Sequence, residues 1–144
     1  METSTMGRVI VQAKIENLED AYRVRRGDMT RADARILDVG EALVDTGATG
    51  LSIPTSLIAK LGLQPGRKRR ARTSAGPLEL QMYDAVRLTI QGRECFTDVT
   101  EVPDDCPVLI GQIPLEALDF VVDMPGQRLI GNPRHGGEHQ IELY

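Results

Sequence analysis

The sequence is poor in aromatic residues and in cysteine. Aromatic side chains make up 3% of its 144 residues and tryptophan is absent, so a folded core has to be built from aliphatic side chains. With only two cysteines, Cys95 and Cys106, the chain lacks the disulfide framework on which many small secreted domains depend. We expect both thiols to stay reduced and to pack as small hydrophobic side chains.

Long hydrophobic runs are also missing. No segment approaches the roughly 20 apolar residues that a membrane-spanning helix needs, and residues 1–5 lack the basic and apolar regions of a signal peptide. Positive charge is not in excess, since 17 Lys and Arg stand against 21 Asp and Glu, a net charge of −4. These absences predict a cytoplasmic protein that binds neither a membrane nor, in general, nucleic acid.

Length and patterning predict one mainly β domain over residues 1–144. A hydrophobic content of 41% is sufficient for a core in a chain of this size. Short β-branched or alternating segments between closely spaced turns predict roughly eight or more strands, the first over residues 9–15. Helical patterns are confined to residues 55–62 and 114–118, and the polar stretch 16–35 is expected to be a hairpin or loop. Such all-β domains form sandwiches or barrels.

An acidic residue stands in a turn of small residues directly after an apolar strand. Residues 43–49 read Leu-Val-Asp-Thr-Gly-Ala-Thr, and the small side chains allow backbone or a ligand to approach closely. Apolar surroundings raise the pKa of such a carboxyl group, whereas the amides of the turn lower it. Because Asp and Gly are also ordinary turn residues, Asp45 in isolation indicates either a simple turn or a catalytic carboxylate.

Asp45 becomes more informative together with the segments that follow it. The hexapeptide at 43–48 resembles the active-site motif of the retropepsin-like aspartic proteases. The Val-Leu-Ile-Gly segment at 108–111, followed by a short helix, is similar to the second apolar segment of that family. Two such pieces about sixty residues apart are more specific than either alone. The resemblance covers residues 36–131 and implies a closed barrel with one or two short helices.

The resemblance also implies a mechanism and a partner. Peptide hydrolysis by this family needs two carboxylates that share one proton, and the chain contains a single Asp-Thr-Gly. Asp45 is therefore expected to meet the Asp45 of a second copy across the axis of a C2 homodimer, with a peptide as substrate and no metal or cofactor. One carboxylate would act as base on a water molecule, and the other, protonated, would polarise the scissile carbonyl.

Further roles follow from the same resemblance, position by position. Thr46 matches the residue that braces the two active-site loops across the dimer axis, and Gly47 the residue that lets substrate backbone lie close. Ala48 lines the same turn, and Ile110 and Gly111 match the segment that supports it from behind. The resemblance assigns the substrate-covering flap to Thr73, Ser74, Ala75, Gly76 and Pro77.

The terminal segments leave alternatives open. Residues 1–35 would add a strand and a polar loop, and the tail at 132–144 is a possible dimer interface because its end alternates in polarity. A latent enzyme, in which the stretch at 16–35 or the tail masks the cleft, is one alternative to an active peptidase. The other is a non-catalytic module of the same fold that binds a peptide or partner.

Two further motifs are expected to be less important. Residues 67–72 contain five basic side chains in six positions and predict a solvated loop, although such a run could also bind an acidic substrate or nucleic acid, or be clipped by a protease. His135 and His139 have the spacing of a zinc pair on a helix, but the two glycines between them disfavour that helix. We therefore expect no metal site.

Overall fold

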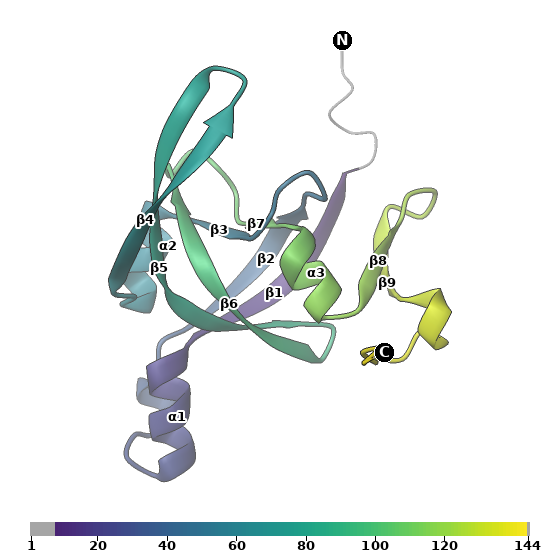
Figure 1. Ribbon diagram of the computed structural model, residues 1–144. Helices are drawn as coiled ribbons and strands as arrows, with labels where there is room; N and C mark the ends of the chain where they lie inside the picture. The colour runs from purple at the N-terminus through teal and green to yellow at the C-terminus, as the bar shows by residue number, and fades with distance from the viewer. Residues whose placement is uncertain (1–7, 144) are drawn as a thin grey trace.

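The computed structural model describes residues 8–143, and about half of them lie in β-strands (Figure 1). The strands are β1 (Val9–Asn17), β2 (Ile36–Val44), β3 (Leu51–Pro54), β4 (Pro65–Thr73), β5 (Gly76–Ile90), β6 (Arg93–Val102), β7 (Leu109–Ile110), β8 (Phe120–Asp123) and β9 (Arg128–Gly131). The helices are α1 (Leu18–Arg26), α2 (Thr55–Leu61) and α3 (Gln112–Ala117), with 3-10 turns at Arg31–Asp33 and Pro133–His135. In this part of the chain, no helix has the length and apolar character to cross a membrane.

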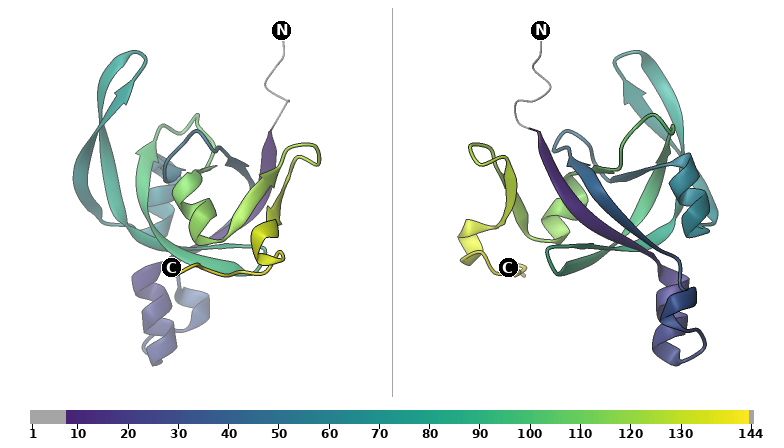
Figure 2. Two further views of the ribbon diagram at one scale, coloured as in Figure 1. Left: turned by 45° about the vertical axis from the view of Figure 1, so that its right-hand side comes forward. Right: turned by 180° about the vertical axis from the view of Figure 1, so that it is seen from behind.

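Six of the strands form a ring. The main sheet has the order β1-β2-β7-β3-β6-β5-β4, and β1 also pairs with β5, so the first six strands return on themselves. Among the described residues, strand β4 pairs with β5 alone and lies outside the ring as an edge strand. A hairpin near the C-terminus, β8 and β9, forms a separate two-stranded sheet beside the ring (Figure 2). The prediction of a mainly β fold is confirmed.

One edge of strand β5 is shared between two neighbours, and the other edge pairs with β6. Its first half pairs with β4, where Leu78 lies opposite Ala71, and its second half pairs with β1, where Leu88 lies opposite Ile15. The β4–β5 hairpin consequently extends beyond the ring (Figure 1). The prediction of a loop at 67–72 is wrong, because this run forms most of β4. An edge strand accommodates charged side chains that face solvent while its backbone pairs on one side only.

The ring encloses the aliphatic core that the composition predicts. Side chains with no exposed surface include Ile15, Leu51, Ile53, Leu88 and Ile110. Phe120 is the one aromatic among the buried side chains of residues 8–143. Helix α2, which the sequence predicted, contributes Ile58 and Leu61 to this core and ends at Gly62, whose φ of 64° is left-handed. Aliphatic packing therefore holds the strands in place.

The stretch between β1 and β2 contains a helix where the sequence predicted a hairpin or loop. Asn17 caps α1 by accepting a hydrogen bond from the Asp20 N–H at 2.9 Å, and Gly27 ends the helix with a left-handed φ of 83°. Acidic residues occupy its first turn and basic residues its last, which is the order that the helix dipole favours. The charges that suggested a loop belong to a surface helix, and α1 raises the number of α-helices in residues 8–143 to three, above the one or two expected.

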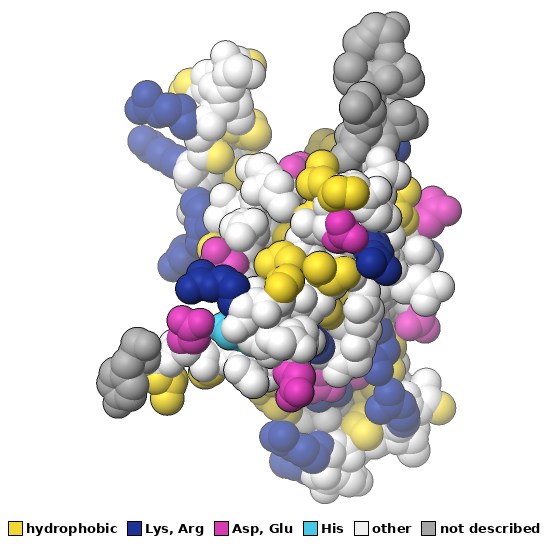
Figure 3. Space-filling view, turned by 90° about the vertical axis from the view of Figure 1, so that its right-hand side faces the viewer, with side chains coloured by type: hydrophobic (Ala, Val, Ile, Leu, Met, Phe, Trp, Pro, Cys, Tyr) yellow, Lys and Arg dark blue, Asp and Glu magenta, His cyan; other side chains and the backbone are white. Residues whose placement is uncertain are grey.

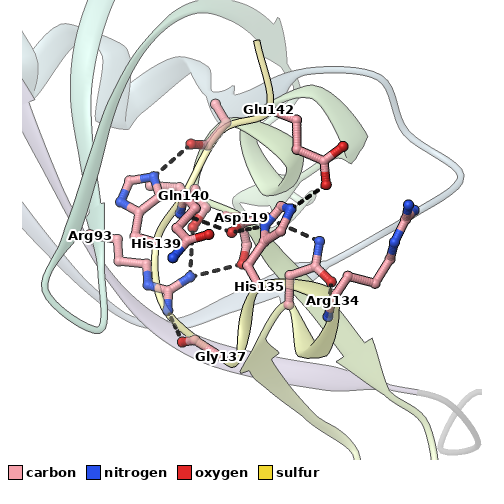
Figure 4. Close-up of polar contacts among 11 residues, drawn as sticks. Arg93, Asp119, Arg134, His135, Gly137, His139, Gln140 and Glu142 are labelled. Carbon is pink, nitrogen blue, oxygen red and sulfur yellow. Dashed lines mark hydrogen bonds and ion pairs between the residues drawn. The ribbon is translucent and has the colours of Figure 1, made fainter. Parts of the chain in front are cut away.

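Polar contacts fasten the C-terminal segment to the ring (Figure 4). Arg93 of β6 donates hydrogen bonds to the carbonyl oxygen of Asp119, at 2.8 Å, and to that of Gly137. The Asp119 carboxylate accepts the Gln140 N–H at 3.1 Å. Residues 138–143 contain no strand, so the alternating pattern of the tail does not form a sheet within one chain. Its part in a dimer interface stays a prediction.

Candidate active site

Asp45 stands at the end of β2, in a loop that turns back toward its carboxylate. The Gly47 N–H donates to Asp45 Oδ1 at 3.0 Å, and the Ala48 N–H donates to the Asp45 carbonyl oxygen at 3.0 Å. The Asp45 N–H donates to the carbonyl oxygen of Ile110 at 2.9 Å. The Asp45 side chain is half-buried. Within residues 8–143 it has no ion-pair partner, and Oδ2 accepts no hydrogen bond.

The strand order explains why the loop lies here. Strand β7 pairs in parallel with β2, placing Ile110 opposite Val44, and antiparallel with β3, placing Ile110 opposite Leu51. The chain between β2 and β3 therefore has to pass around the end of β7. Because Ile110, Val44 and Leu51 are all buried, the base of the loop is anchored in the core while its tip remains accessible.

The start of α3 holds the loop from behind. Three backbone N–H groups at the start of this helix donate to loop carbonyl oxygens at 2.9 Å each: Gly111 to Gly50, Gln112 to Ala48 and Ile113 to Thr49. A Cβ atom at Gly111 would lie 2.6 Å from the carbonyl oxygens of both Ala48 and Gly50. These are backbone atoms and cannot rotate away, so only glycine fits at position 111.

Thr46 and Gly47 form the exposed tip of the loop. A Cβ atom at Gly47 would lie 3.3 Å from Asp45 Oδ1, so a larger residue would crowd the carboxylate. In the part of the chain that the structure describes, the Thr46 hydroxyl has no hydrogen-bond partner, and Ala48 is half-buried beneath the tip. One chain therefore presents a carboxylate and a hydroxyl whose bonding capacity is only partly used.

The segment predicted as a flap is the turn of the β4–β5 hairpin. It contains Thr73, Ser74, Ala75, Gly76 and Pro77, and all but Gly76 are exposed. The Thr73 hydroxyl donates to the Gly76 carbonyl oxygen at 2.8 Å and accepts the Ala75 N–H at 3.2 Å. Gly76 has a φ of 117°, which a side chain would strain. These residues therefore form a tight hairpin turn, whereas its function as a flap stays a prediction.

Other candidate groups are unsuited to catalysis. Burial raises the pKa of the Cys95 thiol to about 11, so this thiol stays protonated and is a poor nucleophile. No group of three or more His, Cys, Asp or Glu side chains in residues 8–143 could hold a metal ion.

The sequence patterns did not predict one polar cluster, which surrounds His135. His135 Nδ1 lies 2.7 Å from Asp119 Oδ2, and Nε2 lies 2.7 Å from Glu142 Oε2 (Figure 4). Both ring nitrogens are thus engaged by carboxylates, and the cluster fastens the C-terminal segment. No local pattern indicates it, because the β8–β9 hairpin separates Asp119 from His135 in sequence and brings them together in space.

Comparison with known proteins agrees with the geometry of the loop. A family model described as aspartyl protease matches residues 34–123. This region includes the Asp45 loop, the β4–β5 hairpin, β7 and α3, and its boundaries are close to those of the resemblance in the sequence. Comparison with curated proteins gives no match. The resemblance based on residues 43–48 and 108–111 is therefore confirmed at the level of the family.

Proposed function

Because the chain belongs to the aspartyl protease family, we propose that it is an aspartic endopeptidase of retropepsin-like type, with the ring of six strands as its closed barrel. The Asp45 loop carries this proposal. It places a half-buried carboxylate at the end of a core strand and ties its backbone to Ile110 at 2.9 Å. A module that only bound peptides would have no need of a carboxylate in this position.

The chemistry requires a second copy of the chain. The sequence contains one Asp-Thr-Gly, at residues 45–47, and two carboxylates about 3 Å apart retain one proton between them because both cannot ionise. In a C2 dimer, the ionised Asp45 takes a proton from water, and the water oxygen attacks the scissile carbonyl carbon. The protonated Asp45 of the other copy donates its proton to the carbonyl oxygen, which gives a tetrahedral gem-diol. The first Asp45 then passes the proton that it took from water to the amide nitrogen, the C–N bond breaks, and the second Asp45 recovers its proton from a gem-diol hydroxyl as the two products leave.

The rest of the Asp45 loop, the turn at 73–77 and the C-terminal tail suit the same dimer. The unpartnered Thr46 hydroxyl would brace the equivalent loop of the second copy, and Gly47 would leave space for the backbone of an extended peptide. The turn at 73–77 would close over that peptide, and the tail at 132–144 would contribute to the interface. Cys95 and Cys106 are free thiols, which suits an enzyme that acts in the reducing cytoplasm.

A subunit-mixing experiment tests this proposal. Purified Asp45→Asn protein is mixed with wild-type protein, subunits are allowed to exchange, and cleavage of a peptide library is measured. Only dimers of two wild-type chains keep both carboxylates, so an equimolar mixture retains about a quarter of the wild-type activity for the same total protein. A retained activity of about half would show that each chain works independently, and would overturn the shared site.

Asp38→Asn is the matched control, because Asp38 is an exposed carboxylate on the same strand. It should leave cleavage unchanged, whereas pure Asp45→Asn protein should fold normally and cleave nothing. Sedimentation over a dilution series gives the dimer affinity. A chain that is monomeric at working concentration and inactive would favour the peptide-binding alternative.

Helix α1 lies at the far end of β1 and β2 from Asp45 (Figure 1), so its position does not favour the latent alternative for residues 18–26.

A further inference from the structure

The strongest concentration of positive charge in the described chain lies on β4. Five basic side chains are exposed there, although the chain as a whole has a net charge of −4. They are Arg67, Lys68, Arg69, Arg70 and Arg72. Figure 3 shows Lys and Arg side chains along one side of the protruding hairpin. The proposed reaction at Asp45 makes no use of them.

This charge is largely unneutralised. Lys68 lies 3.8 Å from Glu79, and Arg69 lies 3.9 Å from Asp98, with all four side chains about half exposed or more. Exposed pairs at such distances contribute little, about 0–1 kcal/mol. Within residues 8–143, the other three cations have no ion-pair partner. The strand therefore presents positive charge that is available to an external group.

The backbone of β4 is available as well. Over Pro65–Thr73 it pairs only with β5, so in the structure of residues 8–143 its outer edge carries N–H and carbonyl groups with no strand opposite them. Side chains alternate along a strand, which places Lys68, Arg70 and Arg72 on one face and Arg69 on the other. A second extended chain added to this edge would meet three cations at every other residue.

We propose that the free edge of β4 binds an extended acidic segment of a protein substrate by strand addition. Backbone hydrogen bonds to the edge would supply affinity, and Asp or Glu side chains at alternate positions would meet Lys68, Arg70 and Arg72. The proposal rests on the proposed peptidase function in one respect, that the bound segment belongs to a substrate. Binding at β4 itself does not require cleavage.

The composition of the hairpin favours a peptide over a nucleic acid. Proteins that bind single-stranded nucleic acid combine cations with aromatic side chains on which bases stack, and residues 65–81 contain no aromatic residue. A sheet edge offers alternating donors and acceptors, which a peptide backbone matches and a phosphate backbone does not. Edge strands are commonly protected from aggregation by charged side chains, especially Lys, or by Pro, and this edge carries five cations in six positions.

The position of β4 suits substrate selection. The strand leads directly into the turn at 73–77, so a segment bound to β4 would lie beside the proposed flap. Attachment at this edge would raise the local concentration of the attached chain near the Asp45 loop. We therefore expect the basic strand to change the KM for substrates that carry an acidic segment, and to leave kcat unchanged.

Binding is measured by fluorescence anisotropy with the Asp45→Asn protein, so that cleavage plays no part. The probe is a labelled nine-residue peptide in which Glu alternates with Thr. Protein with Arg70→Glu and Arg72→Glu should bind it at least tenfold more weakly. The matched control carries Arg23→Glu and Arg26→Glu, two exposed cations on α1, and should bind as the parent does. Circular dichroism establishes that each variant is folded.

Two further probes test the mode of binding. A peptide with Lys in place of Glu should lose binding. Of two Glu peptides, one N-methylated on the odd-numbered and the other on the even-numbered backbone nitrogens, one should lose binding, because only one edge of the added strand pairs with β4. Equal binding of both methylated peptides, unchanged affinity after charge reversal, or tighter binding of a single-stranded RNA of equal length would each overturn the proposal. Peptide binding without any cleavage by wild-type protein would overturn the peptidase function alone. Cleavage without preference for acidic segments would overturn the substrate role of β4 alone.

Discussion

The Nδ1 atom of His135 lies 2.7 Å from Oδ2 of Asp119, and the opposite ring nitrogen lies 2.7 Å from Glu142. Both contacts are hydrogen bonds only when the imidazole carries two protons. The hydrogen bond to Asp119, followed by that to Glu142, raises the pKa of His135, and the hydrogen bond from His135 lowers the pKa of Asp119 to about 2. The protonated imidazole thus joins the C-terminal segment to the residue before β8.

Attachment of the C-terminal segment should depend on pH. Because folding raises the pKa of His135, its stabilisation is complete below the ordinary histidine value of about 6.5 and is lost as pH rises through the higher folded value. The stabilisation from Asp119 is present above its ordinary value of about 3.9 and is lost as pH falls through about 2. Hydrogen exchange of the Gln140 amide, which donates to Asp119, should therefore be slowest between these limits, relative to its intrinsic rate.

Substitution of the two histidines separates this effect from general titration. His135→Gln should remove the loss of Gln140 protection at high pH. His139→Gln should retain it, because His139 is exposed and its one hydrogen bond within residues 8–143 is with the Ala117 carbonyl oxygen. Identical pH profiles for the two variants would contradict the assignment to His135.

Gly111→Ala should destabilise the protein and abolish cleavage. The new Cβ would lie 2.6 Å from the carbonyl oxygens of Ala48 and Gly50, and relief of the overlap requires the Asp45 loop to shift. Overpacking of this kind costs about 1–3 kcal/mol of unfolding free energy, measurable by urea denaturation. Gly40→Ala is the control, since a Cβ there meets nothing within 4 Å. Full activity in Gly111→Ala would show that the loop tolerates displacement.

Arg87→Ala should be the more damaging of two substitutions that break an ion pair. Arg87 lies 2.8 Å from Glu16, whose side chain is 3% exposed, and the hydrogen bond from Arg87 lowers the pKa of Glu16. A buried carboxylate left without its partner costs about 3–5 kcal/mol.

Arg128→Ala breaks a pair whose arginine is 69% exposed and should cost about 1 kcal/mol or less.

Folding lowers the pKa of Glu16, so its contribution is present above the ordinary glutamate value and is lost as pH falls through the lower folded value. The difference in stability between Arg87→Ala and wild-type protein should therefore shrink in acid. A constant difference down to pH 2 would contradict this account of Glu16.

Local patterns predicted the parts of this molecule that local chemistry determines. The turn at Asp45 follows from small residues after an apolar strand, and α2 follows from its apolar spacing and the terminal Gly62. The pairing of Ile15 with Leu88, which closes the ring, joins residues far apart in sequence, and no local pattern specifies it. The contact between His135 and Asp119 also joins residues far apart in sequence, so no local pattern predicts it.

The sequence patterns failed to predict helix α1 for a different reason. Its cap at Asn17 and its stop at Gly27 are visible in the sequence, but its charged side chains give it the appearance of a solvated loop. Only Asp20 of this helix is buried. Gly111 was predicted to support the loop, but the reason that only glycine fits there depends on the approach of two backbone segments in space.

Replacement of residues 18–34 by an Asn-Gly turn should leave a folded and active enzyme. Glu16 lies opposite Ile36 in the antiparallel β1–β2 pair, and the Asn17 N–H donates to the Arg35 carbonyl oxygen at 3.0 Å, so a two-residue turn can join the strands. The excision removes the ion pair of Asp20 with Arg35 and should lower the melting temperature while cleavage stays within about twofold, since α1 lies far from Asp45 along both strands. A variant with a Gly-Ser linker of the original length separates the loss of α1 from the change in loop length. Increased cleavage in both variants would show that this segment restrains the enzyme.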